Sequence, residues 1–167
     1  MKLIIVRHAA AIERTAGIPD ELRYLTSEGR AFSRKTARTM LKNGVEPSLI
    51  LSSPLVRAVQ TADILAETLS YIGPVVVTNE LSPGFDQAAL LKILDTYGQV
   101  DELMLVGHEP DLSRLVSALL FLKEGFTFKK GTAVKLKSDH CFKQPASFKW
   151  LVAGKKLTTS RDEALTY

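Results

Sequence analysis

The chain has 167 residues, of which 46% are hydrophobic and 24% are charged, and its formal net charge is +4 at pH 7. This balance is typical of globular proteins and excludes a chain that is disordered throughout. The single cysteine excludes an internal disulfide, and the four apolar residues between Lys2 and Arg7 are too few for a signal peptide. We therefore expect one domain over residues 1–167, located in the cytoplasm and without a membrane segment.

The positive charge is concentrated towards the C-terminal end of the chain. Residues 1–120 hold 12 Lys and Arg against 14 Asp and Glu, whereas residues 121–167 hold 10 against 4. A solvated basic face explains this distribution, and a patch for an acidic partner is the alternative. Lysines dominate the basic region, which lacks the aromatic and glycine signature of an RNA-binding sheet, so we expect no nucleic-acid binding.

Hydrophobic periodicity and helix-capping residues predict alternating strands and helices. In chain order, the pattern predicts a strand at 2–6, a loop at 14–24, a helix at about 26–43, a strand at 48–51, a helix at 55–69, a strand at 75–77, a helix at 87–97, a strand at 103–106, a helix at 110–120, and two final strands at 132–136 and 147–152. Strands that alternate with helices pair in parallel through right-handed crossovers. The predicted fold is therefore α/β, a three-layer α/β/α sandwich around a mostly parallel central sheet, with the last two strands paired through a turn.

Polar and charged side chains follow the four predicted parallel strands. Reactive groups in such sheets lie beyond the carboxyl ends of the strands, which meet at one edge. We therefore expect one cluster at that edge. In chain order, the candidates are Arg7 and His8, Ser53 and Arg57, Glu80, and His108.

The chemistry of this set points to a phosphoryl group. Two arginines that converge on one point require an anion, and a phosphoryl group fits their forked donors. A neutral imidazole can attack phosphorus and form a phosphohistidine, while a second imidazole donates to the oxygens on which charge develops. Pro110 marks a helix start beside His108, which adds backbone donors and a positive dipole end. Because cationic side chains already neutralise the phosphate, we expect no metal.

Three segments, in this order and spacing, carry a resemblance to a known family: VRHA at 6–9, SSPLVRAVQT at 52–61 and VGHEPDLS at 106–113. Together with LTSEG at 25–29 and ELSP at 80–83, they resemble the histidine phosphatase superfamily, with its phosphoglycerate mutase-like fold. The short chain is most similar to the SixA-type phosphohistidine phosphatase branch.

The resemblance implies that His8 is the phosphorylated nucleophile and that Arg7, Arg57 and His108 complete the phosphate pocket. It also implies a mostly parallel sheet flanked by helices, and no cofactor. Ser53 is expected either to offer its hydroxyl to the substrate or to cap the following helix.

The chain departs from the superfamily pattern at two places. Ala9 stands where the wider superfamily usually has glycine, which is a change of one methyl group. The segment 78–87 is short where other members carry a general acid in a longer insertion, and Glu80 is its only close candidate. Alcohol leaving groups need a proton as they depart, whereas a ring-protonated phosphohistidine leaves as a neutral imidazole. We therefore expect a protein-borne phosphohistidine as substrate.

Other functions remain open at this point. A small-molecule phosphomonoesterase or a mutase-like enzyme would use the same pocket on a small phosphorylated substrate. A non-catalytic phosphohistidine-binding module would have no need of the nucleophile. A metal hydrolase would draw its ligands from His8, His108, Glu109 and Asp111, but Arg7 and Arg57 would repel the cation.

His140 and Cys141 are adjacent, which raises the question of a thiol nucleophile with its own base. Neighbouring side chains of an extended chain point to opposite sides, so the two would not meet. We interpret Cys141 as structural or incidental.

Overall fold

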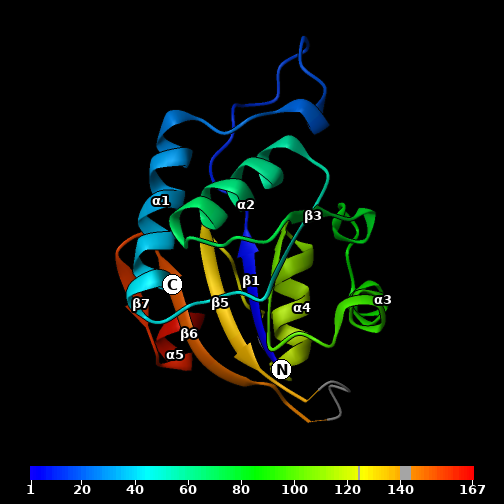
Figure 1. Ribbon diagram of the computed structural model, residues 1–167, viewed down its shortest axis with the longest axis vertical. Helices are drawn as coiled ribbons and strands as arrows, with labels where there is room; N and C mark the ends of the chain where they lie inside the picture. The colour runs from blue at the N-terminus through cyan, green and yellow to red at the C-terminus, as the bar shows by residue number, and fades with distance from the viewer. Residues whose placement is uncertain (124, 140–143) are drawn as a thin grey trace.

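The computed structural model describes residues 1–123, 125–139 and 144–167. It confirms the predicted α/β class, with a seven-stranded sheet in the order β3-β2-β4-β1-β5-β6-β7 and helices packed against it (Figure 1). His140 and Cys141 lie outside the described residues, so the interpretation given for them stays a prediction.

The elements lie close to the predicted ranges. The strands are β1 (Lys2–Arg7), β2 (Leu49–Ser52), β3 (Val75–Val77), β4 (Glu102–Gly107), β5 (Thr132–Lys137), β6 (Ser147–Ala153) and β7 (Lys156–Thr158). The helices are α1 (Ser27–Lys42), α2 (Val56–Thr68), α3 (Gln87–Tyr97), α4 (Asp111–Leu119) and α5 (Arg161–Leu165), with 3-10 turns η1 (Asp20–Leu22) and η2 (Asn79–Leu81).

The sheet has a parallel half and an antiparallel half. Strands β3, β2, β4 and β1 pair in parallel, and β5, β6 and β7 continue the sheet in antiparallel pairs. The predicted hairpin of the last two strands is the β5–β6 pair. Sequence reasoning missed β7 and α5 because elements of three and five residues are too short to show a period.

Helices cover both faces of the sheet, as the alternation of apolar residues along β1 requires. Ile4 and Val6 face a core shared with α1 and α2, whereas Leu3 and Ile5 face a core shared with α3 and α4. These two cores make the three layers and hold β1 rigidly in the middle of the sheet. Among the helices of the described residues, none has both the length and the apolar character that membrane crossing requires.

Candidate active site

The carboxyl ends of the neighbouring strands β1, β4 and β2 bring all the predicted residues except Glu80 to one edge. In the β1–β4 register Arg7 lies opposite Gly107, and His8 and His108 follow directly. Their ring centroids are 5.1 Å apart. Ser53 follows β2, and Arg57 comes from the first turn of α2, with its Nε 3.3 Å from His8 Nε2.

The imidazole of His8 is held in one orientation by the backbone. Its Nδ1 lies 2.7 Å from the carbonyl oxygen of Ala9, which only accepts, so Nδ1 carries the proton and Nε2 the lone pair. Arg57 Nε–H donates to that lone pair. Burial lowers the pKa of His8 to about 3. The hydrogen bond to Ala9 acts to raise this pKa, whereas the nearby cations lower it further. His8 is therefore neutral at pH 7.

Arg57 is itself fixed by Asp20. One guanidinium nitrogen donates to the Asp20 carbonyl at 2.6 Å and the other to its Oδ2 at 3.0 Å. Hydrogen bonds from Arg23 above all, and from Arg57 and Arg14, hold the pKa of Asp20 well below its usual range. Arg57 is only 5% exposed, and the contacts with Asp20 leave its Nε side turned towards His8.

The second imidazole, His108, is 4% exposed and shares a hydrogen bond with Ser53. Its Nε2 lies 2.7 Å from Ser53 Oγ, which also accepts the N–H of Leu55 at 3.4 Å. When the serine hydroxyl donates to Nε2, the proton of His108 lies on Nδ1, which is buried and has no partner within the described part of the chain. Burial lowers the pKa of His108 to about 4, with Arg57 the next cause.

Ser53 thus contacts His108 closely and caps α2 only weakly. Its hydroxyl is fully buried, and the residue with N-cap geometry at α2 is Leu55. The prediction that Ser53 binds substrate stays a prediction.

Arg7 is oriented by a main-chain group from the other half of the chain. Its guanidinium donates to the carbonyl of Phe128 at 2.6 Å. The N–H of Phe128 in turn donates to Ser113 Oγ at 3.2 Å, and the Ser113 hydroxyl donates to Glu109 at 2.5 Å. Burial lowers the pKa of Arg7, and the negative charge of Glu109 partly offsets this shift. Burial also raises the pKa of Glu109. These contacts tie Arg7 to α4.

Glu80, the candidate acid, is exposed in η2. Its carboxylate accepts a hydrogen bond from the Thr78 hydroxyl, which lowers its pKa. Among the described residues, no hydrogen bond or ion pair joins Glu80 to His8, Arg57 or His108. A carboxylate that is ionised at neutral pH is a poor proton donor. Its role as general acid stays a prediction.

The alanines after His8 allow two helices to pack directly on the backbone. The Ala9 N–H donates to Thr61 Oγ1 of α2 at 3.2 Å, and the Ala10 carbonyl accepts the N–H of Thr26 at 3.0 Å. A Cβ on Gly29 of α1 would lie 2.1 Å from that carbonyl oxygen. The Ala9 methyl group is fully buried, so this departure from glycine is accommodated.

The potential metal ligands do not form a cluster. Asp111 is occupied elsewhere, since its Oδ2 accepts the N–H of Gly84 at 2.7 Å. Across the described residues, no group of three or more His, Cys, Asp or Glu side chains is arranged to hold a metal ion.

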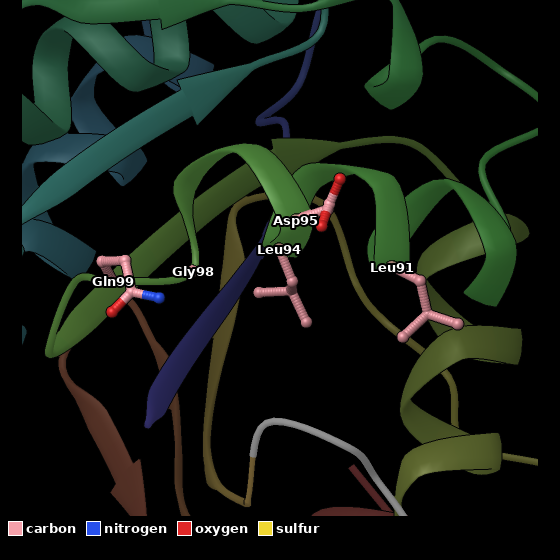
Figure 2. A pocket seen from close by; sticks show the side chains of 5 residues that line it. All are labelled: Leu91, Leu94, Asp95, Gly98 and Gln99. Carbon is pink, nitrogen blue, oxygen red and sulfur yellow. The ribbon is translucent and has the colours of Figure 1, made fainter.

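A surface hollow at α3 is separate from these residues. Figure 2 shows it at and just beyond the end of that helix, lined by Leu91, Leu94, Asp95, Gly98 and Gln99. It offers one carboxylate among apolar and amide groups and no cation to receive a phosphoryl group.

Sequence reasoning missed two residues that hold the arginines of the site in place. Asp20 lies in the loop predicted at 14–24, and the sequence shows only that an acidic residue is present in the segment after β1. Phe128 acts through its carbonyl, and no side-chain pattern reports that.

Comparisons with known proteins show which family the chain resembles. The model of the histidine phosphatase superfamily (branch 1) matches residues 3–82. An uncharacterized protein of Picosynechococcus sp. is 34% identical over 143 residues, which is 83% of this chain and 86% of the relative. Phosphohistidine phosphatase SixA of Escherichia coli K12 is 32% identical over 122 residues, 71% of this chain and 74% of the relative.

The solved structures include a similar fold. A structure of the protein histidine phosphatase SixA complexed with tungstate superposes with a TM-score of 0.82 at 26% identity, over 92% of this chain and 97% of that one. The chain therefore belongs to the histidine phosphatase superfamily, in its SixA-type branch of phosphatases.

Proposed function

We propose that this protein dephosphorylates phosphohistidine in other proteins, through a phosphohistidine intermediate on His8. One observation carries the proposal. The Ala9 carbonyl holds the proton of His8 on Nδ1, so the lone pair of a neutral imidazole lies on Nε2 beside Arg57. A neutral, oriented imidazole next to a guanidinium is a nucleophile for a phosphoryl group.

In the first step, Arg57 Nε–H turns from His8 Nε2 to a phosphoryl oxygen, and the freed lone pair of Nε2 attacks phosphorus, so that a new P–N bond forms as the substrate's P–N bond breaks. The electron pair of the broken bond stays on the departing imidazole, whose other nitrogen already carries a proton, so it leaves neutral. In the second step, water attacks the phosphorus of phospho-His8 and a P–O bond forms as the P–N bond breaks. The electron pair of the broken bond returns to His8 Nε2, and both protons of the water remain on the phosphate, which is released as dihydrogen phosphate.

The remaining site residues have matching roles in this proposal. Arg7 and Arg57 bind the phosphoryl oxygens, and His108, whose ring centroid lies 5.1 Å from that of His8, donates a ring N–H to these oxygens as charge grows on them. The two arginines supply the charge that a metal would otherwise supply, so we propose that catalysis needs no metal. Full activity after treatment with EDTA would support this, and loss that added metal restores would refute it.

The choice of a P–N substrate rests on the missing proton donor. The ionised, exposed Glu80 is poorly suited to protonate an alkoxide leaving group, and an imidazole needs no such donor. A similar protein, SixA of Escherichia coli, is called a phosphohistidine phosphatase, and a SixA structure was solved in complex with tungstate, a tetrahedral oxyanion like phosphate.

The intermediate can be trapped directly. The protein is incubated with radiolabelled phosphoramidate, quenched in base, and mapped by peptide digestion. We expect a base-stable, acid-labile label on His8 that is absent from His8→Asn. Label on another residue, or label that survives in His8→Asn, would contradict the proposed nucleophile.

Leaving-group preference separates phosphohistidine phosphatase from phosphomonoesterase. We expect turnover of a phosphohistidine peptide to exceed that of glycerol phosphate by roughly 100-fold or more at equal concentration, since a general acid is typically worth that much. Equal turnover would favour a phosphomonoesterase, and binding without turnover would favour a binding module.

A further inference from the structure

A second cationic site lies away from His8, in a hollow between α1 and the turn that joins β6 to β7. Its volume is about 510 Å³, and it is lined by Lys35, Arg38, Thr39, Lys42 and Lys155. In Figure 1, α1 lies along the side of the sheet on which β6 and β7 run. Four of the five lining side chains are cations, and none is an acid.

The two segments that carry these cations are locked together. Thr39 Oγ1 donates to the carbonyl of Gly154 at 2.7 Å, and the N–H of Gly154 donates to Thr36 Oγ1 at 2.9 Å. Gly154 adopts a φ of +60°, and a Cβ there would lie 3.0 Å from the ring of Phe32. The backbone that presents Lys155 is therefore fixed against α1 before any ligand binds.

The charge in this hollow is uncompensated. Lys35, Arg38 and Lys42 follow each other at helical spacings of three and four, at which like charges repel. Within residues 1–123, 125–139 and 144–167, none of the four cations takes part in an ion pair. By contrast, the cations around Asp20 share a carboxylate. A multivalent anion would relieve the repulsion in the hollow.

The hollow is also distinct from the candidate active site. The contact of α1 with the nucleophile segment is at Gly29, and Lys35 to Lys42 lie roughly 9 to 20 Å further along the helix at 1.5 Å per residue. Binding there does not depend on the proposed phosphatase activity.

We propose that this hollow binds a compact polyphosphorylated small molecule, with several phosphate groups close together. Its volume lies within the range of small-molecule sites. An arginine fork with three lysine point charges around a concave surface suits clustered phosphate oxygens better than the spaced carboxylates of an extended chain.

The test is a titration of the full chain with inorganic tripolyphosphate. Binding is measured by calorimetry and by the NMR shifts of the backbone amides of Gly154 and Lys155. We expect saturable binding with shifts of these two amides. In Arg38→Gln/Lys155→Gln, affinity should fall about tenfold or more. A matched control, Lys137→Gln/Lys149→Gln, removes the same charge from exposed positions and should leave the affinity within about twofold.

Two further arms separate this site from its alternatives. Arg57→Ala should leave the shifts of Gly154 and Lys155 intact, and their loss would mean that tripolyphosphate acts through the candidate active site. An oligoglutamate peptide that bound more tightly through Arg38 and Lys155 would point to an acidic protein surface. Each of these two results would overturn the proposal. So would a failure of tripolyphosphate to bind, or a loss of affinity in Lys137→Gln/Lys149→Gln as large as that in Arg38→Gln/Lys155→Gln.

Discussion

The parallel and antiparallel halves of the sheet contribute to the candidate site in different ways. The parallel strands β1, β2 and β4 deliver side chains, among them both imidazoles. The segment leading into the antiparallel half delivers main-chain groups, since the Phe128 carbonyl binds Arg7 and the Gly131 N–H binds the carbonyls of Arg7 and His8. One half of the sheet therefore brings side chains to the candidate site, and the segment leading into the other half brings main-chain groups that hold those side chains in place.

The largest expected effect is in the half that supplies side chains. Arg57→Ala should lower kcat/KM on a phosphohistidine peptide by about 100- to 1,000-fold, because removal of a charged donor to the developing charge costs roughly 3–4 kcal/mol. Arg161→Ala in α5 is the control, since its ion pair with Asp162 is exposed and its kcat/KM should stay unchanged. Equal losses in both variants would show that the effect is general electrostatics.

Gly131→Ala tests whether the backbone of the second half is under tight constraint. Gly131 has a φ of +75°, and a Cβ there would lie 2.7 Å from Cδ1 of Phe32. We expect the free energy of unfolding to fall by about 2 kcal/mol through overpacking and left-handed strain, as measured by urea denaturation. Gly17→Ala, where a Cβ meets nothing within 4 Å, should change it little. If Gly131→Ala left the free energy of unfolding unchanged, the backbone at this position would not be tightly constrained, and the contrast between the two halves of the sheet would be wrong.

Ser113→Ala addresses the link between the two halves with a smaller change. It removes the acceptor of the Phe128 N–H and so loosens the carbonyl that orients Arg7. We expect KM for phosphoramidate to rise about three- to tenfold with a smaller change in kcat, as for the loss of one supporting hydrogen bond. Ser113→Thr keeps the hydroxyl and should restore KM, whereas Ser147→Ala, at an exposed position, should match the unaltered protein. A fall in kcat with an unchanged KM would contradict the inference that Ser113 helps to orient Arg7 for substrate binding.

The pH dependence of the two imidazoles is the mildest prediction. With pKa values of about 3 for His8 and about 4 for His108, both rings stay neutral from pH 7 to pH 5. Their NMR Cε1–H signals should therefore not titrate in that range. In the unfolded chain both rings gain a proton near pH 6.5, whereas in the folded chain they do so only near pH 4 and pH 3. The free energy of unfolding is therefore highest above about pH 6.5 and falls as the pH drops from there to about 3. A midpoint near 6.5 for His8 would contradict its burial among cations.

Sequence reasoning located the chemical groups because parallel strands end at one edge. That rule places His8, Arg57 and His108 together from strand positions alone, and the structure brings them within contact. Asp20 and Phe128 escaped because one is an ordinary acid in a loop and the other acts by its carbonyl. The single domain over 1–167 and the cytoplasmic location stay predictions.

The central place of β1 has a consequence for the order in which the protein assembles. β1 is the first strand of the chain, yet its two neighbours are late: Lys2 pairs with Glu102 of β4 and with Lys137 of β5. Arg7 meets the Phe128 carbonyl across 121 residues of sequence. Non-local pairing of this kind slows folding, because the entropy of closing a long loop is lost before the stabilising contacts between the strands form. During synthesis, the strand that leads to His8 therefore has neither of its sheet partners until β4 and β5 have been made, and the candidate site at this end of the sheet is complete only when most of the chain has emerged.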